Sequence, residues 1–150
     1  FRSKPIGIKE IPDHEMKDFG FDELFGKDVK GWVKDPDGNS TGGWGLTLTP
    51  RDMARFGFLY LNNGSWDNRQ ILPRGWIEAS TAMNPNRYGY MWWLYEEDGI
   101  PAYLALGDGG NAICCIPEKD LVVTIASGFI MNPSDRWRLI KDNIIPAIMN

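Results

Sequence analysis

Residues 107 to 128 read G-D-G-G-N-A-I-C-C-I-P-E-K-D-L-V-V-T-I-A-S-G, and this stretch is the most informative about the fold. It predicts two strands, at 109 to 116 and 121 to 127, joined by the tight turn Pro117-Glu118-Lys119-Asp120. So short a connection makes the pair antiparallel. Both strands are apolar without alternation, whereas antiparallel sheets usually keep one face in water. We therefore expect helices on both faces of this sheet.

Two glycines open the first of these strands. Because Gly109 and Gly110 carry no side chain, another backbone can approach them closely. This arrangement suits a strand that also forms one wall of a substrate cleft.

Two further strands are predicted upstream. Residues 88 to 95 are aromatic on both faces, and the pair Asp98-Gly99 is a hairpin signal leading into a strand at 100 to 106. Three acidic residues at 96 to 98 cluster at the hairpin tip, where water relieves their repulsion. We interpret them as a solvated turn rather than an acid–base pair.

Three helices are predicted around these strands. Thr49-Pro50-Arg51-Asp52 supplies a cap, a first-turn proline and an acid near the positive helix end, and this helix should reach about Asn62. A second helix ends before Pro85. A third opens at Asn132-Pro133-Ser134-Asp135, and Pro146 should kink or end it. The predicted fold class is α+β, an α/β/α sandwich with an antiparallel meander covered by helices on both faces.

Composition narrows the function classes. A chain of 150 residues is long enough for one domain with a core and too short for two ordinary ones. The net charge of −4 argues against nucleic acid as a partner, because no basic stripe is present to neutralise phosphates. No apolar run approaches the roughly 20 residues of a membrane helix. Cys114 and Cys115 should point to opposite faces of their strand, so we expect buried thiols and no disulfide between them.

The sequence gives little support for a metal site. His14 is the single histidine and lies in a polar segment. Asp35-Pro36-Asp37-Gly38-Asn39 superficially resembles a calcium loop, but Ser40 and Leu46 stand where such a loop needs Gly and Glu, so a plain turn is favoured. No metal site and no cofactor are expected.

Two other segments allow alternative interpretations. Met91-Trp92-Trp93 suits core packing better than a sugar-stacking platform. Gly42-Gly43-Trp44-Gly45 is either a place of close backbone packing or a flexible loop, and its spacing does not decide between them.

Several segments along the chain are informative through their order and spacing. They are Pro5-Ile6-Gly7-Ile8, Gly42-Gly43 with Gly45-Leu46, Thr49 with Asp52-Met53-Ala54-Arg55-Phe56, Asn63-Gly64 with Gln70-Ile71-Leu72 and Trp76, Tyr88-Gly89-Tyr90 with Trp92-Trp93, and Gly107-Asp108-Gly109-Gly110-Asn111 with Pro117-Glu118 and Asp120-Leu121-Val122-Val123. Together these segments resemble the serine β-lactamase and penicillin-binding-protein-like hydrolases, especially the class C and esterase-like branch. The resemblance covers most of the chain.

This resemblance implies an acyl-enzyme mechanism, in which the serine of a Ser-x-x-Lys motif attacks an amide, ester or lactam carbonyl with help from a Tyr-x-Asn motif. No serine of this chain is followed three residues later by lysine. Tyr60-Leu61-Asn62 fits the second motif literally but ends a helix predicted to be buried. We therefore expect residues 1 to 150 to be the C-terminal part of a single β-lactamase-like domain, inactive by itself.

The resemblance also implies site residues. The backbone N–H of Asn111 corresponds to one donor of the oxyanion hole, and Asp108, Gly109, Gly110 and Trp44 are the candidate substrate-binding residues. A substrate is expected to lie along this strand edge, much like an added strand. Asp108 stands where relatives carry Lys, His or Tyr, and its carboxylate should repel a substrate carboxylate. We expect neutral esters or amides to be preferred to penicillins.

Two other functions stay open. One is a non-catalytic module that binds peptidoglycan, peptide or glycan through Trp44, Trp92 and Trp93. The other is an assembly domain, because a truncated sheet leaves unpaired edges that favour self-association. The expected partners are a small-molecule or peptide substrate and the missing N-terminal part, and the cellular location is left open.

Overall fold

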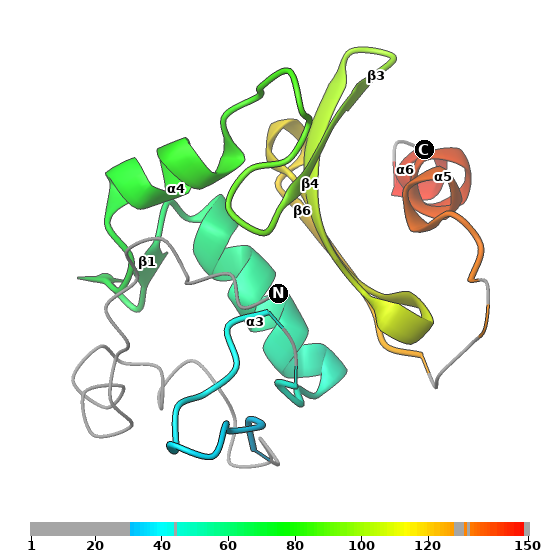
Figure 1. Ribbon diagram of the computed structural model, residues 1–150. Helices are drawn as coiled ribbons and strands as arrows, with labels where there is room; N and C mark the ends of the chain where they lie inside the picture. The colour runs from blue at the N-terminus through cyan, green and yellow to red at the C-terminus, as the bar shows by residue number, and fades with distance from the viewer. Residues whose placement is uncertain (1–30, 44, 128–130, 132, 149–150) are drawn as a thin grey trace.

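A four-stranded antiparallel sheet forms the centre of the computed structural model, which describes residues 31–43, 45–127, 131 and 133–148 (Figure 1). The strands follow one another in sequence order, each antiparallel to the next. They are β3 (Trp93–Glu97), β4 (Ile100–Gly107), β5 (Asn111–Ile116) and β6 (Leu121–Ile125). The predicted meander is confirmed, with β6 ending earlier than expected.

Helices cover both faces of this sheet (Figure 1). One face carries α3 (Pro50–Leu61) and α4 (Arg74–Thr81), and a small hairpin of β1 (Ser65–Trp66) and β2 (Arg69–Gln70) joins these two helices. The other face carries a C-terminal helical segment, composed of α5 (Arg136–Leu139), the π-turn η3 (Ile140–Ile144) and α6 (Ile145–Ile148). The predicted α/β/α sandwich is therefore confirmed.

Neighbouring residues of β5 point into two different cores. Ile113 and Cys115 pack on the α3 side, whereas Cys114 packs with Leu104 and Trp137 on the side of the C-terminal helix. Both cysteines are free and buried, as expected. Burial raises the pKa of the Cys114 thiol to about 12, and it raises the pKa of Cys115 further, so both thiols stay protonated at neutral pH.

The core on the α3 side is largely aromatic. The ring of Tyr60 lies 4.7 Å from that of Trp92, and Trp92 lies 5.1 Å from Tyr103, measured between ring centroids. Tyr60 is only 6% exposed, so the literal Tyr-x-Asn motif is a packing feature of α3. Trp92 is a core residue, as favoured from the sequence, but Trp93 is 45% exposed and lies against Tyr88 at the sheet edge.

The start of α3 follows its predicted capping signal. The Thr49 hydroxyl accepts a hydrogen bond from the Asp52 N–H at 3.2 Å and donates one to the Asp52 carboxylate at 2.6 Å. Arg55 also bonds this carboxylate at 2.7 Å, so the fully buried Asp52 is paired. A buried acid needs such partners to offset the loss of water.

The strand predicted at 88 to 95 is wrong in its first half. β3 begins only at Trp93, and the preceding residues form a loop in which Arg87 and Met91 have positive φ. The backbone of this loop makes hydrogen bonds that do not belong to a strand ladder. The N–H of Tyr90 donates to Ser80 O, and Arg87 O accepts from the N–H of Leu94. The aromatic side chains of residues 88 to 92 therefore do not alternate between two faces, as they would in a strand.

Pro146 changes the last helix without ending it. The N–H of Ile145 donates to Ile140 O, five residues back, which defines a π-turn immediately before the proline. Because Pro146 has no N–H to donate to the preceding turn, the wider turn avoids an unmade bond and the helix continues as α6. In the part of the chain that the structure describes, no helix combines the length and apolarity needed to cross a membrane.

Candidate functional site

The turn between β4 and β5 holds the residues singled out from the sequence. Asp108, Gly109 and Gly110 form a short 3-10 turn, η1, and β5 starts only at Asn111, so the two glycines do not open a strand as predicted. Gly109 has φ +77° and Gly110 φ +93°, a region that costs L-residues with a side chain about 1–2 kcal/mol. The backbone of the turn therefore favours glycine at both positions.

The expectation that a substrate adds as a strand beside β5 is also wrong. β5 pairs with β4 on one side and with β6 on the other, so neither edge is open. What this region presents is the turn itself, at one end of the sheet (Figure 1).

The three carbonyl groups of η1 are each bound by a side chain from a different place. Asn111 Nδ2 donates to Asp108 O at 3.1 Å, within the hairpin. Ser127, which follows β6, donates its hydroxyl proton to Gly109 O at 2.6 Å. Arg136, the first residue of α5, donates from Nε to Gly110 O at 2.9 Å. The turn is thus fixed to its own hairpin, to the segment after β6 and to the C-terminal helix.

Gly110 is also tightly packed against the segment that leads into the C-terminal helix. A Cβ atom at this position would collide with Arg136 Nη2 and would lie 2.9 Å from Pro133 Cβ. The space that the missing side chain leaves is therefore taken by the Arg136 guanidinium and not by a substrate. This corrects the sequence interpretation, in which the glycine made room for a ligand.

The other candidate residues are placed as follows. Asp108 is exposed, and Asn111 is half-buried with its side-chain oxygen accepting from Ser127 N–H at 3.0 Å. Trp44 and His14 lie outside the described residues, although Gly45, the neighbour of Trp44, packs against Val33. Four of the five candidates are consecutive in the chain and lie in η1 or directly after it.

Ser127 and Arg136 were missed by sequence reasoning. Both lie far along the chain from the turn, and their hydrogen bonds depend on tertiary packing. The polar run Asn132-Pro133-Ser134-Asp135-Arg136 predicts a helix start, and nothing in it indicates a contact with the turn.

The acidic hairpin tip is not simply solvated. Lys141, in the C-terminal helix, bonds Glu97 at 3.2 Å and Asp98 at 3.0 Å, and the hydrogen bond with Asp98, followed by that with Glu97, raises the pKa of the lysine. The predicted turn at Asp98-Gly99 is confirmed, but two of its three acids hold the helix to the hairpin. They form a structural contact rather than a catalytic pair.

The loop that superficially resembles a calcium site is an ordinary turn. Asp35 Oδ1 accepts from the N–H groups of Asp37 and Asn39, and the Asn39 N–H is the main cause of the lowered pKa of Asp35. Its carboxylate thus serves its own loop. Within the described ranges, no group of metal-ligating side chains has the arrangement needed to hold a metal ion.

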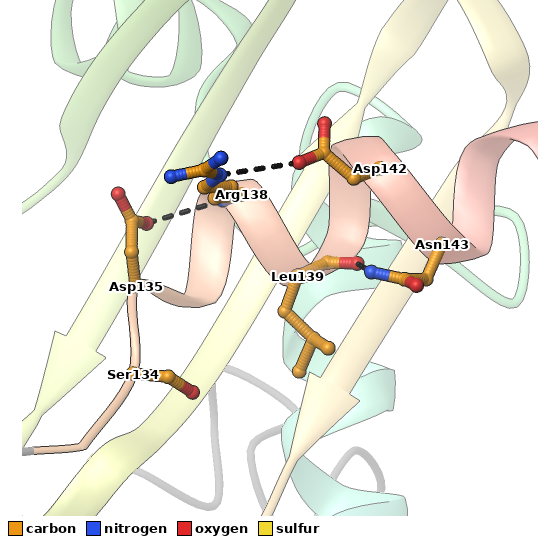
Figure 2. Close-up of a pocket in the computed structure, with 6 residues that line it drawn as sticks. All are labelled: Ser134, Asp135, Arg138, Leu139, Asp142 and Asn143. Atoms are coloured by element: carbon orange, nitrogen blue, oxygen red, sulfur yellow. Dashed lines mark hydrogen bonds and ion pairs between the residues drawn. The ribbon is translucent and has the colours of Figure 1, made fainter.

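A shallow hollow of about 370 Å³ lies along the outer side of α5 (Figure 2). Its polar groups already bind one another, since Arg138 bonds Asp142 at 3.3 Å and Asn143 bonds Leu139 O at 3.1 Å. None of the candidate site residues lines it. We therefore place the candidate site at η1.

Comparison with known proteins defines the fold. The search for a matching family model found none, and none of the curated proteins matched the chain. The structure resembles the solved structure of a "Putative 6-aminohexanoate-dimer hydrolase from Bacillus anthracis", with a TM-score of 0.64 and 28% sequence identity. The match covers 78% of this chain. The chain has a β-lactamase-like fold.

The β-lactamase-like fold confirms the resemblance drawn from the sequence at the level of architecture. The match covers 32% of the Bacillus anthracis protein, so this chain spans about a third of that protein's length.

Proposed function

We propose that this chain is the C-terminal part of a serine hydrolase that cleaves amide, ester or lactam bonds through an acyl-enzyme. The observation that carries the proposal is the similarity to the Bacillus anthracis hydrolase, at 28% identity over 78% of this chain. The share of that protein that is matched, 32%, leaves ample length for further catalytic parts in a whole protein of similar size.

The nucleophile of this hydrolase comes from outside the chain. Ser80 is buried and donates to Ile77 O at 3.0 Å, and the Ser127 hydroxyl is used by Gly109 O. Neither serine has the lysine that the mechanism requires three residues later. The chain alone is expected to be inactive.

The role proposed for η1 is the oxyanion side of the cleft. When a serine attacks a carbonyl carbon, the carbonyl oxygen takes up negative charge, and a fixed backbone N–H stabilises that charge. The N–H of Asn111 is the proposed donor. Its support is the rigid placement of the turn by hydrogen bonds to three consecutive carbonyls.

Asp108 indicates the substrate class. Its carboxylate is exposed at the same turn and would repel a substrate carboxylate nearby. The similar Bacillus anthracis protein is described as a putative 6-aminohexanoate-dimer hydrolase, which supports hydrolysis but does not bear on the charge of the substrate. We propose neutral esters or amides as substrates, in preference to penicillins.

The alternative, a binding module that uses its tryptophans, is weakened by the fold. Trp92 is 2% exposed and is committed to the core, so it offers no surface to a glycan. Trp93 is exposed and its ring packs against Tyr88, whereas Trp44, the third tryptophan of this alternative, lies outside the described residues.

A fluorophosphonate probe on the full-length protein tests the proposal. We expect one labelled serine, in a Ser-x-x-Lys motif N-terminal to Phe1, and loss of labelling when that serine is replaced by alanine. A full-length protein that stays unlabelled while binding a peptide or glycan would support the binding module instead. Efficient cleavage of a chromogenic cephalosporin would contradict the proposed substrate class.

A further inference from the structure

Peptide geometry links the carbonyl that Arg136 binds to the proposed oxyanion donor. In a trans peptide, the C=O of one residue and the N–H of the next lie in one plane and point in opposite directions, and the described residues contain no cis peptide. The oxygen of Gly110 and the N–H of Asn111 belong to the same peptide. A bond that fixes the Gly110 oxygen therefore also fixes the direction of the Asn111 N–H.

Arg136 is well placed to fix this peptide. Its Nε lies 2.9 Å from Gly110 O, its Nη2 occupies the space beside the Gly110 Cα, and its Nη1 donates to Ser134 Oγ at 3.2 Å. The guanidinium is thus held at more than one point and cannot easily rotate. A positively charged donor also polarises the peptide it binds, which strengthens the N–H at its other end as a donor.

We propose that Arg136 is a positioning residue of the hydrolase: it orients and polarises the Gly110–Asn111 peptide, so that the Asn111 N–H is held as an oxyanion donor. The inference rests on the function proposed above for the turn. Arg136 does not touch the reacting atoms in this scheme and acts only through the peptide.

The test compares Arg136→Gln with Arg138→Gln in the full-length protein. Arg138 lies two residues along the same helix, and its side chain is 80% exposed, so it controls for loss of charge from α5. Removing an oxyanion donor costs about 100- to 1,000-fold in kcat, and loosening one should cost less, about tenfold. We expect that loss for Arg136→Gln with an unchanged KM, and no loss for Arg138→Gln.

Two further variants separate positioning from folding. Arg136→Lys keeps the charge but lacks the rigid fork, so it should recover part of kcat. Arg136→Ala should regain activity when millimolar guanidinium is added, which a merely unfolded protein would not do. An Arg136→Gln variant that keeps kcat, or that changes KM alone, would overturn the inference.

Nuclear magnetic resonance of the same full-length variants separates a failure of this inference from a failure of the proposed function. The carbonyl carbon resonance of Gly110 and the amide resonance of Asn111 should both shift in Arg136→Gln and stay in place in Arg138→Gln. If the wild-type protein fails to react with a fluorophosphonate, the proposed function fails but these resonances still report the positioning. Unchanged resonances would refute it whatever the activity.

Discussion

Gly110 is constrained in two independent ways. Its φ of +93° is unfavourable for any residue with a side chain, and the Arg136 guanidinium occupies the space where a Cβ would stand. The first constraint belongs to the local turn, and the second belongs to the contact between the turn and the C-terminal helix.

Gly110→Ala and Gly99→Ala separate these two constraints. Gly99 has φ +73° and nothing within 4 Å of an added Cβ, so its replacement costs only backbone strain, about 1 kcal/mol. Gly110→Ala should lower the free energy of unfolding by about 2 kcal/mol or more, because the guanidinium must also move. Urea unfolding of the full-length protein measures both. Equal losses would show that the Arg136 contact is not tight.

Buried thiols make stability depend on alkaline pH. Burial raises the pKa of Cys114 from 9.0 to about 12. As the pH rises above about 9, the unfolded chain releases the thiol proton while the folded chain keeps it, so stability falls with rising pH. The slope of unfolding free energy against pH above 9 should be smaller in Cys114→Ala than in the wild type, as measured by urea titrations at several pH values. An unchanged slope would contradict the assignment.

At the scale of single elements, the start of α3 is fixed by hydrogen bonds among residues that lie close together in the sequence. Thr49 caps the helix and also bonds Asp52, which in turn holds Arg55. The cap, the first-turn proline and the acid were all readable from adjacent residues, and the structure uses each of them as expected.

Thr49→Ala should cost about 1 kcal/mol of unfolding free energy, because it removes the cap and one partner of the buried Asp52. Thr49→Ser keeps the hydroxyl and is the matched control, with a loss of less than about 0.5 kcal/mol. Thermal or urea unfolding measures the loss of stability in each variant. If serine and alanine behave alike, the hydroxyl contributes nothing measurable.

At the scale of the whole molecule, the two edges of the described sheet differ in character. β3 carries Glu96 and Glu97, and Tyr88 forms a bridge to its first residue. β6, at the other edge, reads Leu-Val-Val-Thr-Ile without a charge. Charges and coverage protect an edge from pairing with another chain, whereas an uncharged apolar edge invites it.

We expect the 150-residue chain alone to self-associate through β6. Thr124→Lys places a charge on this strand and should shift the chain toward monomer, as measured by light scattering over a range of concentrations. Glu96→Lys, on the opposite edge, is the control and should leave the association unchanged. A monomeric wild-type chain would refute the prediction.

Most of the architecture could be predicted because it follows from periodicity and short connections. The apolar pattern of residues 111 to 125 required two covered faces, and the pair Cys114-Cys115 divides between those faces as expected. The loop at residues 88 to 92 could not be predicted, because aromatic residues suit a strand or a core loop equally well. The candidate turn was found by resemblance, but its strand assignment was wrong, since two glycines do not distinguish a strand start from a turn.

The sequence by itself determined the antiparallel meander, the helix starts and the absence of a lysine three residues after any serine, because each depends on residues close together in the chain. Only the tertiary structure decided what fills the space beside Gly110 and what binds the carbonyls of the turn. Ser127 and Arg136 reach the turn from other elements. The place of Ser127 depends on the pairing of β6 with β5, and that of Arg136 on how the C-terminal helix packs on the sheet, and no local pattern encodes either contact.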